Sequence, residues 1–213
     1  MTRADRRTLL LALSLALLAG YVDALGYLTL KGFFVSFMSG NSTRLSVGLA
    51  SGNGSTIATA GGLILLFVLG VIAGAVGEGR AKRRRVLSLV AGLLALAALA
   101  ASLGRGHAAI AFATLALGAE NQAVQKAGPV SIGVTYMTGT LVRMGQGIAD
   151  ALRGGPRWIW LPYALLWASL VLGAVAGAAV YPVLHLRGLW LAALWCGVLA
   201  VLAGADTDPS PER

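Results

Sequence analysis

The sequence predicts an all-α integral membrane protein with about six transmembrane helices, arranged as an inverted 3+3 repeat. Three observations support this fold class: the apolar composition, the placement of the basic residues, and an internal repeat. Of the 213 residues, 57% are hydrophobic and only 12% are charged. A soluble domain carries about a quarter charged residues, so this composition indicates a membrane protein.

Long apolar runs supply the spans, because a helix needs about 20 apolar residues to cross a bilayer. The runs occupy residues 8–30, 56–77, 86–103, 108–124, 159–180 and 188–203. The first run continues past Gly20 in a polytopic chain, which favours a first span over a signal peptide. We expect one membrane domain over residues 1–213, with a polar tail at 205–213.

Two polar, glycine-containing stretches interrupt these runs and are similar to each other. They read FVSFMSGNSTRL at residues 34–45 and VTYMTGTLVRM at residues 134–144. Aligning Met38 with Met137 also aligns Gly40 with Gly139, and it brings the second and third runs onto the fifth and sixth. This similarity predicts internal repeats over residues 8–103 and 108–204.

The basic residues set the expected orientation. The net charge is +9, from 17 Lys and Arg against 8 Asp and Glu. Because Lys and Arg mark cytoplasmic loops, the N-terminus and the basic loop at residues 80–85 are expected inside, which requires three spans per half. An odd number of spans inverts the second half. We therefore expect a multi-pass protein of the cell inner (cytoplasmic) membrane with a cytoplasmic N-terminus, and no nucleic-acid partner.

The two polar stretches are candidates for broken or re-entrant helices, as found at the midplane sites of inverted-repeat transporters. Glycines at 40 and 139 permit unusual backbone angles. New helices over 42–52 and 141–153 would then have as caps Ser39, Asn41, Ser42, Thr138 and Thr140. Their N-termini would suit an anionic or polar ligand. The alternative is a pair of interfacial loops followed by surface helices.

Ionisable and amide side chains within the spans form the second part of the candidate site. Asp23 interrupts the first run, and the alignment places it on Gln122, beside Glu120 and Asn121. Such residues are costly in a membrane and usually face a cavity or a partner. Asp23 and Glu120 are candidate proton, cation or substrate sites, with Asp23 the favoured coupling acid, although Asp23 could instead hold the halves together. Asn121 and Gln122 suit a polar solute.

Other residues carry weaker signals. Arg44 and Arg143, one turn into the expected helices, could attract an anion or extend to the interface as anchors. The Gly-x-x-x-Gly pairs at 70/74 and 173/177 predict close helix packing, and an exposed pair would permit a homodimer. With one cysteine, two histidines and no nucleophile–base set in the sequence, we expect no enzyme, no cofactor and no metal site.

Four motifs together resemble one family. They are GYVDALGYL at residues 20–28, MSGNS at 38–42, GAENQA at 118–123 and YMTGTL at 136–141. In this order they are similar to the YoaK family of bacterial membrane proteins (DUF1275), whose function is unknown. The resemblance implies a polytopic inner-membrane protein of about six spans. The residues that match its pattern are Asp23, Gly40, Asn41, Asn121, Thr138 and Gly139, whereas Glu120, Arg44 and Arg143 depart from it.

The expected function is a transporter or permease-like protein for a small polar solute in the lipid bilayer, working by alternating access. A channel lined by paired re-entrant helices is the first alternative, and it would show no saturation of flux. A structural or regulatory membrane subunit is the second, and it would show no flux and a stable partner.

Overall fold

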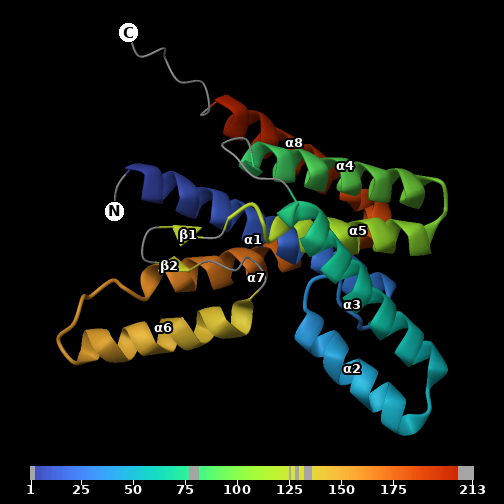
Figure 1. The fold of residues 1–213 in the computed structure, drawn as a ribbon, viewed down its shortest axis with the longest axis horizontal. Helices are drawn as coiled ribbons and strands as arrows, with labels where there is room; N and C mark the ends of the chain where they lie inside the picture. Colours follow the sequence, from blue (N-terminus) through green and yellow to red (C-terminus); the bar gives the residue numbers. More distant parts are fainter. Residues whose placement is uncertain (1–2, 77–81, 125, 128–129, 132–135, 206–213) are drawn as a thin grey trace.

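The computed structural model describes residues 3–76, 82–124, 126–127, 130–131 and 136–205 (Figure 1). Its helices are α1 Arg3–Thr29, α2 Met38–Ser51, α3 Gly54–Ala75, α4 Lys82–Ser102, α5 Gly106–Glu120, α6 Met137–Leu152, α7 Leu161–Leu184, the 3-10 turn η1 His185–Gly188, and α8 Leu189–Ala205. A two-residue ladder pairs β1 Lys126–Ala127 with β2 Val130–Ser131. The all-α class is confirmed apart from this ladder. Parts of four predicted segments lie outside the described residues: position 77 of the second apolar run, positions 80–81 of the basic loop, positions 134–135 of the second motif, and 206–213 of the tail.

Several helices are long and apolar enough to cross a bilayer, which supports a multi-pass membrane protein. They are Arg6–Thr29, Gly54–Ala75, Lys82–Ser102 and the run Leu161–Ala203, which contains α7, η1 and α8. The expected fourth span is shorter than its apolar run, because α5 has only 15 residues. At 1.5 Å per residue, such a helix covers about 22 Å of a hydrocarbon core of about 30 Å. The count of six spans therefore stays a prediction.

Large apolar side chains cover the outside of the bundle. On α3 and α7, exposed examples are Leu65, Ile72, Leu172 and Val175. On a soluble protein, exposed apolar patches of this extent mark a surface that binds a partner or a membrane. In this protein, contact with lipid accounts for them. The interior is built from leucine, valine and many alanines on α1, α4, α5 and α8. Small side chains let these helices approach closely, as is usual in membranes.

Glycines allow α1 to pack along α7. A Cβ added at Gly173 or Gly177 of α7 would collide with the carbonyl oxygen of Leu17 or Tyr21 of α1. In the reverse direction, a Cβ at Gly20 of α1 would collide with a carbonyl of α7. The prediction that the 173/177 pair allows close helix packing is therefore confirmed, and the packing is between two helices of the same chain.

The contact between α3 and α5 repeats the same pattern. A Cβ at Gly70 or Gly74 of α3 would meet the carbonyl oxygen of Leu115 or Ala119 of α5, at 2.8 Å for the second pair. Gly118 of α5 meets a carbonyl of α3 in return. Neither Gly-x-x-x-Gly pair is thus an exposed face for a homodimer.

The matching contacts define a structural alignment in which Gly20 corresponds to Gly118. This alignment pairs Asp23 with Asn121, so the gapless sequence alignment, which paired Asp23 with Gln122, is out by one residue here. Figure 1 shows the corresponding helices running in opposite directions, α1 against α5, α3 against α7 and α4 against α8. An inverted repeat would produce both relations.

Candidate functional site

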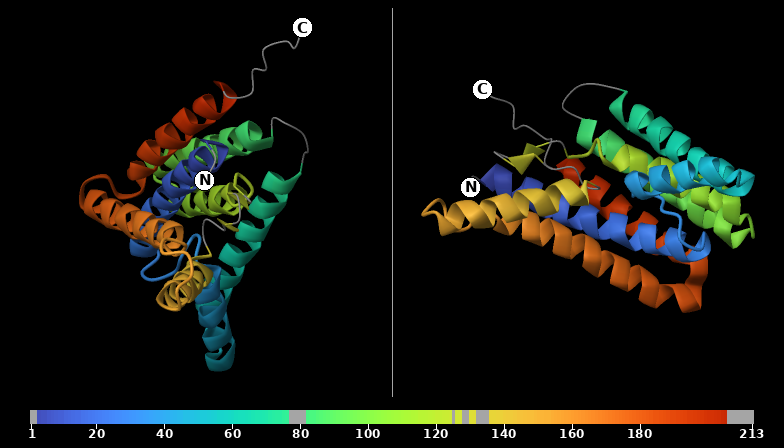
Figure 2. Two further views of the ribbon diagram at one scale, coloured as in Figure 1. Left: turned by 90° about the vertical axis from the view of Figure 1, so that its left-hand side faces the viewer. Right: turned by 90° about the horizontal axis from the view of Figure 1, so that it is seen from below.

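The first turns of α2 and α6 meet near the centre of the molecule. From there the two helices run toward opposite ends (Figures 1 and 2). A cavity of about 420 Å³ lies between them, and its described lining is Ser36, Phe37, Met38, Ser39, Phe67, Tyr136, Met137, Thr138 and Gly139. The structure thus brings the two repeated motifs together around one hollow.

Both helices begin earlier than the sequence indicated, and the predicted caps are wrong. The residues before α2 and α6 are Phe37 and Tyr136, and neither makes a side-chain cap hydrogen bond. Ser42 Oγ donates to the carbonyl of Met38 at 2.8 Å, and Thr140 Oγ1 donates to the carbonyl of Tyr136 at 3.2 Å. Both hydroxyls therefore lie within the helices. The N–H groups of a first helical turn have no intrahelical acceptor, so these two helix starts can serve a ligand.

The glycines of the two motifs, Gly40 and Gly139, do not adopt the backbone conformation that the sequence predicted. Gly40 and Gly139 are helical and are absent from the positive-φ residues of the described chain, so the prediction of unusual backbone angles is wrong. A Cβ at Gly40 would lie 2.7 Å from Cδ1 of Phe37, which makes this glycine a packing residue. A Cβ at Gly139 would meet nothing within 4 Å. Gly139 therefore leaves open space beside the cavity.

Asp23 and Asn41 hold the segment that leads into α2. Asp23 Oδ1 accepts hydrogen bonds from the backbone N–H of Val35 at 2.8 Å and of Ser36 at 2.9 Å. Asn41 is fully buried; its Oδ1 accepts from the N–H of Phe34 at 3.1 Å, and its Nδ2 donates to the Phe34 carbonyl at 2.6 Å. Since Ser36 lines the cavity, both side chains position its wall.

The polar cluster at the end of α5 contributes no residue to the described cavity lining. Glu120 is 0% exposed, and within the described chain neither carboxyl oxygen has a hydrogen-bond partner. Asn121 Nδ2 donates to the carbonyl of Leu117 at 3.0 Å. The Gln122 side chain packs against α3, with Cγ 3.1 Å from the Cβ position of Gly74. None of these three residues is in the described lining that contains Ser39, Thr138 and Gly139.

The two motif arginines do not line the cavity in the described structure. The guanidinium of Arg44 lies 4.9 Å from the ring centroid of Phe33 in a cation–π contact. Arg143 is exposed on α6. Among the described lining residues none is charged, so helix N-termini and hydroxyl groups provide the polarity of the cavity.

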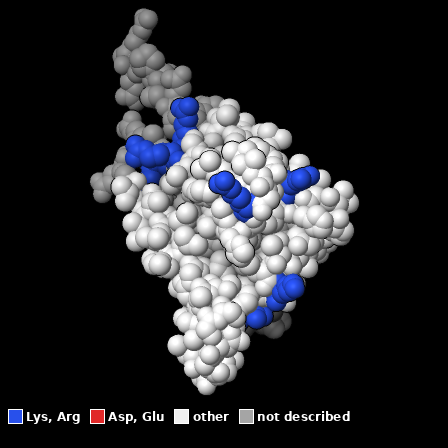
Figure 3. All heavy atoms as spheres, turned by 90° about the vertical axis from the view of Figure 1, so that its right-hand side faces the viewer, with Lys and Arg blue, Asp and Glu red and all other residues white. Residues whose placement is uncertain are grey.

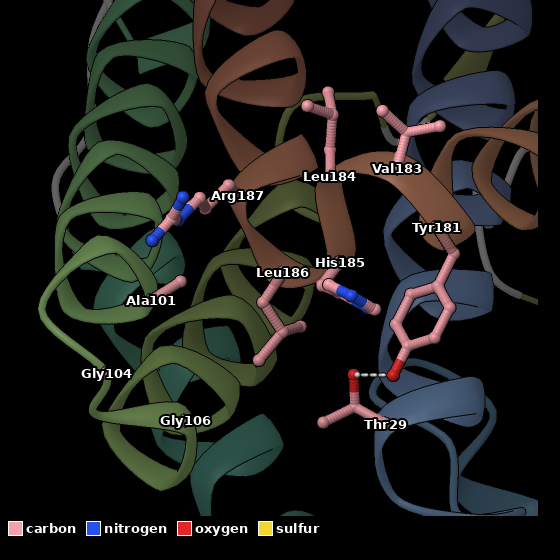
Figure 4. Close-up of a pocket in the computed structure, with 10 residues that line it drawn as sticks. All are labelled: Thr29, Ala101, Gly104, Gly106, Tyr181, Val183, Leu184, His185, Leu186 and Arg187. Atoms are coloured by element: carbon pink, nitrogen blue, oxygen red, sulfur yellow. Dashed lines mark hydrogen bonds between the residues drawn. The ribbon is translucent and has the colours of Figure 1, made fainter.

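Two further hollows lie elsewhere. A groove of about 660 Å³ runs between α1 and α7, and Asp23 lies among its largely apolar lining. A pocket of about 420 Å³ lies at the end of α7, where His185 meets the Tyr181 ring edge-on at 5.2 Å and Thr29 Oγ1 donates to Tyr181 Oη at 3.3 Å (Figure 4). Neither hollow is lined by both motifs.

Sequence reasoning missed several residues of the cavity wall. Phe67 comes from the middle of α3, in an apolar run that carries no distinguishing signal. Ser36, Phe37, Met38, Tyr136 and Met137 lie at the borders of the motifs and are recognisable as lining only once the helix starts are known.

A comparison with known families identifies the family of the chain. Residues 11–202 match the family model described as a protein of unknown function, DUF1275. The chain belongs to this family. Within the DUF1275 family, it is 35% identical over 196 residues to the UPF0700 transmembrane protein RA0705 of Rhizobium meliloti (strain 1021), covering 91% of this chain and 83% of that protein.

A second DUF1275 relative is the UPF0700 transmembrane protein YoaK of Bacillus subtilis (strain 168). It is 34% identical over 164 residues, covering 71% of this chain and 72% of the relative. The resemblance to the YoaK family is therefore confirmed, and both relatives are described as transmembrane proteins. No solved structure matches the chain.

Proposed function

We propose that this protein is a transporter for a small polar solute, which binds in the cavity between the first turns of α2 and α6. The observation that carries the proposal is the meeting of two related, uncapped helix N-termini around that cavity. Inverted-repeat transporters bind their substrates at such helix breaks. Transport as proposed requires no catalytic residue and no cofactor.

The cavity chemistry narrows the class of solute. Two helix N-termini contribute partial positive charge and N–H donors. Hydroxyl groups of Ser36, Ser39 and Thr138 add donors and acceptors, and rings of Phe37 and Tyr136 would cover the apolar part of a solute. Because no described lining side chain is charged, a neutral solute rich in acceptor oxygens, or a monovalent anion, fits best.

Helix packing suggests the moving parts. One group contains α1, α7 and α6; the other contains α5, α3 and α2. Within each group, glycine contacts hold two long helices together and the half-helix packs on one of them. Each group contributes one helix start to the cavity, so relative movement of the groups would expose it to one side and then the other. These groups correspond to each other in the proposed 3+3 inverted repeat.

In the proposed orientation the protein lies in the inner membrane of the cell, with its N-terminus in the cytoplasm. In Figure 1, α1 and the basic start of α4 both run from left to right, and α6 ends at the left, before Arg153 and Arg157 of the connection to α7. The opposite end shows scattered basic side chains and no acidic ones among the described residues in view (Figure 3). This asymmetry follows the positive-inside rule.

The proposal can be tested by blocking the cavity. Purified protein in liposomes is assayed for uptake of radiolabelled glycerol, urea, formate and lactate. Gly139→Trp should abolish saturable uptake, because its side chain fills the cavity without a clash of its Cβ. Gly145→Trp on the same helix is the matched control, since its Cβ also meets nothing within 4 Å and it is absent from the lining.

A second test requires no knowledge of the solute. With Cys196 replaced by Ala, Ser39→Cys should react with an impermeant thiol reagent added from either side of the membrane, because alternating access opens the cavity to both. A thiol that reacts from neither side would overturn the proposal.

A channel is the second candidate, because two half-helices meeting at the centre of a bundle can also line a continuous pore. The distinction is kinetic. A transporter saturates at modest solute concentration and shows trans-stimulation, whereas flux through a channel stays proportional to the gradient.

A further inference from the structure

Glu120 is a buried carboxyl at the end of α5, without a hydrogen-bond donor in the described structure. The core around α4 and α8 includes the thiol of Cys196, which is fully buried. That thiol donates to the carbonyl of Leu87 of α4 at 3.4 Å. Glu120 itself is fully buried at the end of α5, a helix that packs against α3 and α4.

Among the described residues, Glu120 makes no hydrogen bond and no ion pair. Helix α3 carries no titratable side chain, and the basic residues of α4 are confined to its start at Lys82–Arg85. On α1, Tyr21 donates to the carbonyl of Gly188 at 2.9 Å, and Asp23 accepts from two backbone N–H groups. An ionised Glu120 would thus have nothing to offset its charge.

The first half of the chain shows that packing does not require a carboxyl here. When Gly118 is aligned with Gly20 through their matching contacts, Glu120 corresponds to Val22 of α1. Val22 is a buried core residue. An apolar side chain fills the related place, so the second half retains a carboxyl at a cost in stability, as functional sites often do.

We propose that Glu120 is a proton-binding site whose loading and unloading drive the movement of the two helix groups; this inference rests on the proposed transport function. In the described conformation the carboxyl holds a proton, because an isolated buried carboxylate is far more costly than the neutral acid. Movement of α5 against α4 would expose the carboxyl and release the proton as H⁺, leaving the carboxylate.

A proton suits the site better than a metal ion. The described residues contain no group of three or more His, Cys, Asp or Glu side chains that could hold a metal. Asp23, the acid favoured from sequence, has backbone donors already on its carboxylate and suits a positioning role instead. The proton site is therefore assigned to Glu120, whose carboxyl has no hydrogen-bond partner in the described structure.

Reaction with dicyclohexylcarbodiimide tests the assignment, because this apolar reagent adds to protonated carboxyls in apolar surroundings. Mass spectrometry of the purified protein should find the adduct on Glu120 at pH 6, with a several-fold loss at pH 9. Asp23→Asn should leave the adduct unchanged, and Glu120→Gln should eliminate it. Failure of wild-type Glu120 to react at pH 6, or protection by NaCl but not by KCl, would overturn the proton assignment.

Thermal unfolding provides a second readout. Glu120→Gln and Glu120→Val should unfold at or above the wild-type temperature, and their advantage should increase from pH 6 to pH 9 as the wild type loses its proton. A lower unfolding temperature for Glu120→Gln at both pH values would instead show that Glu120 has a structural partner, and would refute the proposal. Neither measurement uses a solute, so its failure is distinguishable from failure of the transport proposal.

Discussion

Removal of the Asp23 carboxylate tests whether this acid positions the cavity wall. Asp23 Oδ1 accepts from the N–H groups of Val35 and Ser36, and these two residues are 0% and 5% exposed. A hydrogen bond to a charged group contributes about 1.5–3 kcal/mol. Asp23→Ala leaves two buried donors unpaired and should therefore lower the free energy of unfolding by about 3–6 kcal/mol.

Asp23→Asn separates the charge from the geometry. The amide oxygen can still accept both hydrogen bonds, each now worth about 0.5–1.5 kcal/mol, so the expected loss is about 2–3 kcal/mol and the protein should stay folded. We expect solute uptake to fall sharply in this variant, because a looser segment at residues 30–37 displaces Ser36 from the cavity wall.

Titration of mixed micelles with a denaturing detergent measures these losses. Asp150→Ala is the control, because its carboxylate is exposed and lies 3.9 Å from Arg153, an arrangement worth at most about 0.5 kcal/mol. If Asp23→Ala were no more destabilised than Asp150→Ala, the hydrogen bonds would not hold the segment. A folded Asp23→Asn with unchanged uptake would remove Asp23 from the mechanism.

Two further predictions concern topology and packing. In a cysteine-free background, Ser55→Cys should react with an impermeant thiol reagent outside intact cells and Arg153→Cys should not; equal labelling would contradict the inverted repeat. Arg153 is used because its neighbour Gly154 has φ of +90°, where a side chain is strained. Gly173→Ala should destabilise by about 1–3 kcal/mol, since its Cβ would collide with a carbonyl of α1, whereas Gly197→Ala, with open space around its Cβ, should be neutral; equal losses would argue against the close crossing.

The sequence by itself determined the class of protein and the pairing of its motifs. Apolar content and run length depend only on composition and order along the chain, so they indicated a membrane protein directly. The similarity of the Met38 and Met137 stretches was equally readable, and so was the packing role of the glycines at 70/74 and 173/177. These features are local, or they repeat at a fixed separation.

Only the tertiary structure decided where α2 begins, because the Asp23 and Asn41 hydrogen bonds fold the chain back and leave Phe37 at the start of α2. The alignment of Asp23 with Asn121 likewise depended on where the helix pairs cross. The same long-range contacts distinguished the two acids: a folded-back segment supplies N–H donors to Asp23, whereas Glu120 faces apolar helices that offer no donor in the described structure. Contacts between distant segments made these decisions, and no local pattern encodes them.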